Sequence, residues 1–209
     1  MARKPAARDL DGDILEAAMT RIGEGGWDGL FLRDLAADLG VGLDELRGRM
    51  GSRLGVLRLL SKRLDREMLK NDPTELDGMT PRERLFELLM HRFDAMLPYK
   101  PGMARLVRDA PRRPELWAPI ACNVDRMASW LMEAASIRYH GPKARLARRL
   151  LAAAYGATLR VWVDDVSEDQ ARTLAELDKR LAQLERLAGL SWPGRRSPSP
   201  DGTGTAEAA

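Results

Sequence analysis

The sequence predicts an all-helical fold. Along most of its 209 residues, apolar side chains recur at the three- and four-residue spacing of amphipathic helices. Alternating runs of β-branched residues, which are typical of strands, are almost absent. A chain of this length can bury a proper core and form one or two domains. Its single cysteine, Cys122, excludes an internal disulfide framework.

Four helices are expected in the first third of the chain, at 11–24, 31–38, 42–48 and 52–70. The first has an apolar face from Ile14 to Ile22 and ends at the Gly25–Gly26 pair. A tight turn at Gly40–Gly42 joins the second helix to the third. The fourth is expected to begin with Ser52 as its N-cap and to end before Pro73.

Five further helices are expected in the rest of the chain. One begins at a capping box of Thr80 and Glu83 and stops at Pro98, and a short one lies between Pro101 and Pro111. A long helix with Pro119 in or near its first turn is expected to end near His140. The last two are expected at 143–163 and 167–190, and the second opens with Ser167 and Gln170 in capping-box spacing.

The domain organisation follows from these elements. We expect a flexible arm at 1–10, a three-helix unit at 11–56 whose following helix continues to about 70, a helical unit at 71–190, and a tail at 191–209. The tail is rich in proline, serine and glycine, so it is expected to be disordered.

Two short helices joined by a glycine-containing turn, with a helix before and a longer one after, are the layout of a helix-turn-helix module. Such a module lays one helix in the major groove, so the 11–56 unit is expected to bind double-stranded DNA. The formal net charge of +3 is too small to indicate nucleic acid by itself. From Gly42 to Arg66, however, seven basic and three acidic residues give a net charge of +4, which suits contact with phosphate.

The same residues carry a family resemblance. Matching positions are Ile14, Ala17 and Ala18, then Gly26–Trp27, Leu32–Ala36, Gly40–Val41 and Gly51–Arg53, and in this spacing they resemble the DNA-binding domain of the TetR family of bacterial regulators. The resemblance implies a homodimer on a near-palindromic operator, with half-sites about one DNA turn apart. It also implies that phosphates and base edges are contacted by Arg33, Gly42, Leu43, Asp44, Arg47, Gly48, Arg49 and Arg53.

The recognition helix departs from the family pattern at four positions. Arg47 and Met50 stand where TetR-like helices usually have an aromatic pair, and Asp44 and Glu45 stand where they have small residues. Carboxylates repel phosphate, although they also accept a hydrogen bond from cytosine N4. The alternative to DNA binding is a three-helix bundle that kept its shape and lost its DNA.

A second resemblance lies in the last third of the chain. Tyr155, Thr158, Asp165, Ser167, Thr173, Leu177, Asp178 and Arg180 resemble the C-terminal domain of the coenzyme Q biosynthesis accessory proteins. That family implies a lipid-binding protein that binds ubiquinone precursors and assists a hydroxylase, which is the alternative function. Physical chemistry also gives these residues ordinary roles: Asp165 and Ser167 as caps of the last helix, and Asp178 and Arg180 as solvated or cross-interface charges. The polar residues after Leu190 cannot form the membrane-touching helix of those relatives.

An apolar small molecule, such as a lipid or a quinone precursor, is expected to bind among the helices that begin near 81, 115 and 143. The predicted lining is Phe93, Met96, Trp117, Met127, Trp130, Leu131, Tyr155, Leu159 and Trp162. For any single one of these residues, plain core packing is the stronger alternative, because a large apolar side chain at helical spacing is usually part of the core. No cluster of charged residues suggests a polar ligand.

The last two helices are expected to form a four-helix bundle with those of a second subunit, because the leucine seam of the last helix is long and regular. The predicted interface is Leu146, Leu150, Ala157, Val161, Leu174, Leu177, Leu181 and Leu184. Packing within one chain is the alternative.

Nothing in the sequence indicates an enzyme or a cofactor. His91, His140 and Cys122 lie apart, without a partner at metal-ligand or catalytic spacing, and no nucleotide-binding loop or nucleophile elbow occurs. The adjacent pair Asp164 and Asp165 suits a helix cap better than a catalytic dyad. No secretory segment, membrane anchor or long uncharged apolar run is found, so a cytoplasmic location is expected.

Overall fold

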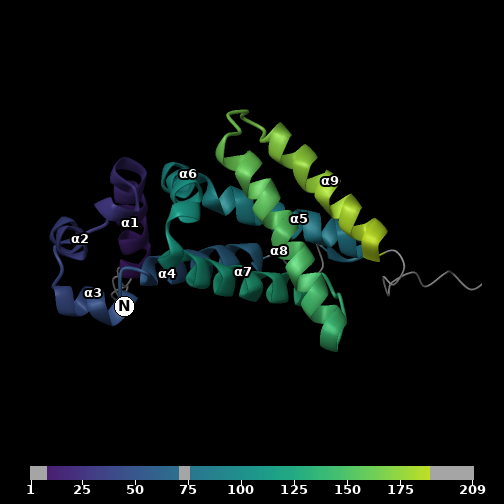
Figure 1. Cartoon of the computed structure of the whole chain (residues 1–209), viewed down its shortest axis with the longest axis horizontal. Coiled ribbons are helices and arrows are strands. Elements are labelled where there is room, and N and C mark those ends of the chain that lie inside the picture. The colour runs from purple at the N-terminus through teal and green to yellow at the C-terminus, as the bar shows by residue number, and fades with distance from the viewer. Residues whose placement is uncertain (1–8, 71–75, 189–209) are drawn as a thin grey trace, which may run out of the picture.

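The computed structural model describes residues 9–70 and 76–188, and this part of the chain is all-helical, as the sequence predicts. The helices are α1 (Leu10–Gly25), η1 (Trp27–Gly29), α2 (Leu32–Leu39), α3 (Leu43–Met50), α4 (Gly55–Met68), α5 (Pro81–Met96), η3 (Leu97–Tyr99), α6 (Lys100–Asp109), η4 (Ala110–Arg112), α7 (Pro114–Ala134), α8 (Gly141–Val163) and α9 (Ala171–Ala188). In Figure 1, α1–α3 form one end of an elongated molecule, and α5, α8 and α9 form the other. The predicted tail at 191–209 and most of the predicted arm at 1–10 lie outside the described residues.

The N-terminal unit is built on the buried face of α1. Ile14, Ala18 and Ile22 are fully buried, and Asp9 caps the helix by accepting a hydrogen bond of 3.1 Å from the backbone N–H of Gly12. Gly40 ends α2 with a φ of 65°, the left-handed conformation that glycine adopts without strain. After this turn, Leu46 of α3 is 1% exposed and packs into the same core as the buried face of α1.

The start of α4 differs from the prediction. Ser52 is not the N-cap, because the helix begins at Gly55 after the cap position of Leu54, which makes no side-chain cap. The backbone N–H of Gly55 instead donates to the carbonyl of Ser52 over 2.8 Å, in a tight turn. From there α4 packs against α1, α3, α5 and α7, and thus joins the N-terminal unit to the rest.

The middle of the chain confirms one cap and corrects one helix end. At α5, Thr80 and Glu83 form the predicted capping box, with hydrogen bonds of 3.3 Å and 2.6 Å. The prediction that the long helix reaches His140 is wrong, because α7 ends at Ala134 and Ser136 takes a left-handed φ of 58°. Pro119 lies inside α7, in its second turn.

The two units share an extensive contact between α1 and α6. Gly102 of α6 lies so close to α1 that a Cβ there would be 2.5 Å from the backbone oxygen of Met19. The backbone N–H of Trp27 also points to Asp109 at the end of α6, at 3.4 Å. The three-helix unit is therefore braced by α6 as well as by α4. No helix within 9–70 and 76–188 is both long and apolar enough to cross a membrane.

Candidate DNA-binding surface and ligand cavity

The α2–turn–α3 unit presents one face of α3 to solvent. Leu46 and Met50 anchor α3 at a four-residue spacing, which leaves most of its other side chains exposed. The exposed residues include seven of the eight predicted to contact DNA: Arg33, Gly42, Leu43, Asp44, Arg47, Gly48 and Arg49. These residues are therefore accessible to a partner, and their contact with DNA stays a prediction.

The eighth residue, Arg53, lies over the ring of Trp27, with 4.9 Å from its guanidinium carbon to the ring centroid. Arg49 is tied to Asp11 of α1 at 3.3 Å, although both side chains stay largely exposed. Arg47 has no ion pair within the described residues, so it is the freer of the two arginines on α3. Phe31, at the N-cap of α2, is 61% exposed, and sequence reasoning missed it because it precedes the periodic part of the helix.

Acidic and basic residues separate along α3. Asp44 and Glu45 lie in its first turn and Arg47 and Arg49 in its last, which is the arrangement that stabilises a helix dipole. The side chain of Asp44 folds back over the backbone at Gly42, where a Cβ would collide with its carboxylate. Two negative charges therefore stand at the N-terminal end of the face that would enter the groove.

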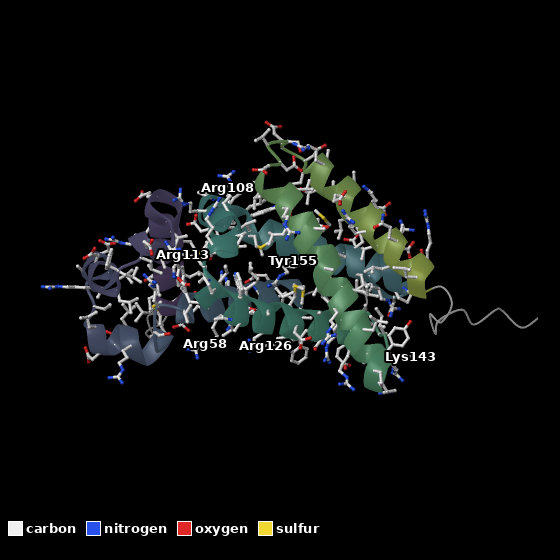
Figure 2. The ribbon with its side chains drawn as sticks, viewed as in Figure 1. Arg58, Arg108, Arg113, Arg126, Lys143 and Tyr155 are labelled. Carbon is white, nitrogen blue, oxygen red and sulfur yellow. The ribbon has the colours of Figure 1, made fainter. Side chains whose placement is uncertain are left out.

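The end of α3 is fastened to α4 by Arg58. Its Nη2 donates to the backbone oxygens of both Arg49 and Met50, each at 3.3 Å. In Figure 2, Arg58 lies between Tyr155, at the middle of the molecule, and the α1–α3 end. A shift of α4 would therefore be passed on to the C-terminal end of α3.

A largely apolar cavity of about 500 Å³ lies between α4, α6, α7 and α8. Its apolar walls are Leu57, Leu60 and Leu64 of α4, Met103, Leu106 and Val107 of α6, Trp117, Ile120, Ala121 and Val124 of α7, and Ala152, Gly156 and Leu159 of α8, with Ala110 and Pro111 at one end. A space of this size and character suits a small organic molecule. The same α4 and α6 that brace the N-terminal unit thus form two of its walls.

Only some of the nine residues predicted to line a pocket do line the cavity. Trp117, Tyr155 and Leu159 do line the cavity, and Trp117 is 56% exposed at its edge. Phe93, Met96, Met127, Leu131 and Trp162 are fully buried and do not line it, so the alternative of core packing applies to them. Trp130 is half exposed and lies outside the cavity.

The cavity also contains a polar group that the sequence reasoning missed. Arg92 of α5 is 4% exposed and lines the wall. Its Nη1 donates to Asp65 of α4 at 2.6 Å, and its guanidinium stacks over Tyr155 of α8 at 5.6 Å. Ser61 donates to the second carboxylate oxygen of Asp65 over 3.3 Å. The sequence indicates no cluster of charged residues at this site, whereas the structure places the buried Arg92 in the cavity wall.

The turn between α8 and α9 is held by Asp165. This fully buried carboxylate accepts hydrogen bonds from the backbone N–H groups and hydroxyls of Ser167 and Thr173, at 2.5–3.2 Å. Burial alone would raise the pKa of Asp165, but these hydrogen bonds outweigh it and hold the pKa well below its ordinary value. Ser167 Oγ also accepts from the N–H of Ala171, the first residue of α9, so Asp165 and Ser167 cap the last helix as predicted. The predicted start at Ser167 is wrong, and the side chain of Gln170 bonds to Trp162 and Asp94 instead of completing a capping box.

The other charges of this hairpin stay within the chain. Asp178 pairs with Arg82 of α5 at 2.6 Å, and Arg180 pairs with Glu176 at 2.6 Å. Asp178 is 59% exposed, which agrees with the prediction of a solvated charge, and a role of either residue across a subunit interface stays a prediction.

The predicted dimer residues divide into two groups. Leu177 and Leu181 are at most 1% exposed, so they offer no surface to a second subunit. Leu146 is 59% exposed, and Leu150, Ala157, Val161, Leu174 and Leu184 are half-buried. Leu146, Leu150 and Leu184, together with the exposed Leu187, line a second apolar hollow of about 210 Å³ between α8 and α9.

Known proteins resemble this chain both in the α8–α9 hairpin and in the overall fold. The COQ9 family model matches residues 146–188, which is the α8–α9 hairpin. A search of curated protein sequences finds no match. Among solved structures, a TetR transcriptional regulator from Nitrosomonas europaea has a TM-score of 0.69 and 24% identity, over 86% of this chain and 99% of that chain.

Two more distant structures agree. A putative TetR-family regulator from Rhodococcus sp. has a TM-score of 0.59 and 19% identity, over 83% of this chain and 97% of that chain. A TetR-family regulator from Streptomyces coelicolor has a TM-score of 0.61 and 13% identity, over 88% and 84%. At such identities the likeness establishes the fold. The chain therefore has the fold of the TetR regulators, with an α8–α9 hairpin that matches the COQ9 family.

Proposed function

We propose that the chain is a homodimeric, DNA-binding regulator of the TetR type, controlled by a small molecule in the cavity. One observation carries the proposal: α4 holds the end of α3 through Arg58 and also forms a wall of the cavity. A ligand acts on DNA binding only if it favours one placement of α3 over another, and α4 supplies that connection.

The exposed face of α3 supports the choice of DNA as partner. Arg47 and Arg49 can donate hydrogen bonds to guanine edges or to phosphates, and Arg33 at the start of α2 can donate to a phosphate. We place the dimer contact on the outer faces of α8 and α9, around Leu146 and Leu187, since these apolar side chains are exposed in the single chain. Two-fold symmetry would then set two copies of α3 on a near-palindromic operator.

The double substitution Arg47→Ala with Arg49→Ala tests the reading face. It is expected to lower affinity for operator DNA by about a hundredfold, because each arginine contact to a base or phosphate contributes roughly 1–3 kcal/mol. The measurement is a titration of DNA from upstream of the protein's own gene against random competitor DNA, at two salt concentrations. Arg138→Ala with Arg172→Ala, two exposed arginines outside α1–α4, is the control for lost charge. Equal affinity of the wild type and the α3 variant would exclude α3 as the reading helix.

Removal of the two carboxylates of α3 is expected to raise the affinity for DNA, whereas removal of the two arginines lowers it. Asp44→Asn with Glu45→Gln is expected to raise affinity for random DNA by about three- to tenfold at low salt, because two charges that repel phosphate are removed. Glu168→Gln with Asp169→Asn, in the α8–α9 turn, makes the same charge change far along the chain and should leave affinity unchanged. If both variants behave alike, Asp44 and Glu45 do not face the DNA.

The alternative is a lipid-binding accessory protein of ubiquinone biosynthesis that no longer binds DNA. It is favoured by the COQ9 match over 146–188, a segment that supplies Tyr155 and Leu159 to the cavity. Mass spectrometry of an organic extract of the purified protein separates the two functions. A bound prenylated lipid, with no sequence-specific DNA binding, would favour the accessory protein.

A further inference from the structure

We propose that the cavity binds an amphipathic acid, whose carboxylate pairs with the guanidinium of Arg92 and whose apolar body fills the space between α4, α6, α7 and α8. This deepens the ligand control proposed above and rests on it. The inference starts from Arg92, a charged side chain that is nine-tenths buried and lines an otherwise apolar space. Such a group has to find hydrogen-bond acceptors, because a buried unpaired charge is strongly unfavourable.

The hydrogen bonds of Arg92 leave capacity for a ligand. A guanidinium has five N–H donors and no acceptor. Nη1 donates to Asp65 at 2.6 Å and Nε to the hydroxyl of Tyr155 at 3.4 Å, whereas no hydrogen bond of Nη2 is found in the described part of the chain. The second oxygen of Asp65 is engaged by Ser61, so one carboxylate does not saturate the arginine. A second carboxylate, supplied from the cavity, suits the remaining donors.

The charge of the lining residues favours a ligand with an acidic head group over one with a cationic or neutral head group. Both charged residues that line the cavity are basic: Arg92 is buried in the wall, and Arg160 is exposed on α8. No aspartate or glutamate is among the lining residues, and Asp65, which pairs with Arg92, is not one of them. A cationic head would be repelled by both arginines, and a neutral hydrocarbon would leave the donors of Arg92 unused. The apolar walls account for the rest of the molecule.

The placement of Arg92 also explains how such a ligand reaches the DNA-binding unit. Arg92 holds Asp65, which lies on α4 seven residues after Arg58, and Arg58 holds the end of α3. A ligand carboxylate on the remaining donors of Arg92 would share the guanidinium with Asp65 and so bear on the tie to α4. The residue that anchors the acid is therefore the one that ties α5 to α4.

Matched probes with different heads test the proposal by calorimetric titration of the full chain at pH 7, without DNA. Decanoic acid is compared with 1-decanol and decylamine, and naphthalene-2-carboxylic acid with 2-naphthalenemethanol. At least one acid is expected to bind about tenfold or more tightly than its alcohol, because a charge-assisted hydrogen bond is worth about that factor. Decylamine is expected to bind weakest. Equal binding of acid and alcohol in both pairs, or no binding of any probe, would overturn the proposal.

Variants then assign the preference to Arg92. Arg92→Met should bind the alcohol as the wild type does and lose the preference for the acid, and the retained alcohol binding shows that the variant is folded. Arg92→Met with Asp65→Asn removes both charges, so that the result does not depend on an unpaired Asp65. Arg160→Met is the control at the exposed arginine and should keep the preference. An acid preference that survives both Arg92 variants contradicts the assignment.

The outcome is separable from that of the proposed function. Acid binding without sequence-specific DNA binding would support the cavity assignment and reject the regulator. Sequence-specific DNA binding with no acid preference would do the reverse.

Discussion

Gly55→Ala is expected to abolish detectable operator binding. Gly55 is the first residue of α4, and a Cβ there would overlap the backbone oxygen of Met50, the last residue of α3. The clash is with backbone, so no side chain can turn away to relieve it. The end of α3 must move relative to α4, and the hydrogen bond from Arg58 to the same oxygen must change with it.

The expected cost has two parts. Forcing a methyl group into this contact should lower the free energy of unfolding by about 1–3 kcal/mol. The larger effect falls on binding, because displacement of α3 disturbs every contact of the reading face at once. Loss of operator affinity should exceed that of the Arg47 and Arg49 double variant. DNA titration and thermal unfolding of the same preparation measure the two effects.

Gly25→Ala is the matched control for this substitution. Gly25 ends α1, and a Cβ there would have no atom within 4 Å. The control should bind operator DNA as the wild type does. Full binding by Gly55→Ala would show that the α3–α4 junction does not set the position of the reading helix.

The parts of the structure that depend on neighbouring residues were predictable from sequence. The turn at Gly40, the capping box of Thr80 and the cap formed by Asp165 each depend on residues no more than eight positions apart. The end of α7 was not, because the left-handed Ser136 that stops the helix is a residue type with no strong preference for that conformation.

The ligand cavity was predictable only in part, because helical periodicity identifies an apolar face but not its neighbour. Phe93 and Met96 are core residues, whereas Trp117 and Leu159 line the cavity, although all four lie on helical faces of similar composition. For the same reason, the sequence did not predict that α4 and α6 form two walls of the cavity. For the dimer, the leucine seam of α9 predicts an interface with a second subunit, but Leu177 and Leu181 of that seam pack inside the chain.

One missed residue did leave a signal. Arg92 lies seven residues after Leu85 and three after Leu89, on the apolar stripe of α5 that continues to Met96. A charge on such a stripe is either paired or functional, since burial without a partner is unfavourable. The sequence could therefore have pointed to Arg92, but not to Asp65 as its partner across 27 positions.

Asp165→Asn is expected to destabilise the α8–α9 hairpin strongly, because the carboxylate is fully buried. The carboxylate accepts hydrogen bonds on both oxygens, from Ser167 on one and from Thr173 on the other. An asparagine would turn an NH2 group toward donors on one side and leave them unsatisfied in a buried site. The free energy of unfolding should fall by about 3 kcal/mol, measured by urea denaturation at pH 7.

The neighbouring residue provides the control. Asp164 pairs with Arg108 at 2.9 Å, but both side chains are more than half exposed. Asp164→Asn should therefore change the free energy of unfolding by less than about 1 kcal/mol. Equal effects of the two substitutions would mean that the hydrogen bonds of Asp165 contribute little.

The pH dependence of stability follows from the same carboxylate. The pKa of Asp165 in the folded chain is well below its ordinary value of 3.8, so the folded state holds the charged form more strongly than the unfolded state does. Its contribution is fully present above the ordinary pKa and is lost as the pH falls below 3.8 toward the folded pKa. Denaturation curves between pH 7 and pH 2 should show a steeper acid loss for the wild type than for Asp165→Asn. Parallel curves would show that Asp165 titrates alike in the folded and unfolded states.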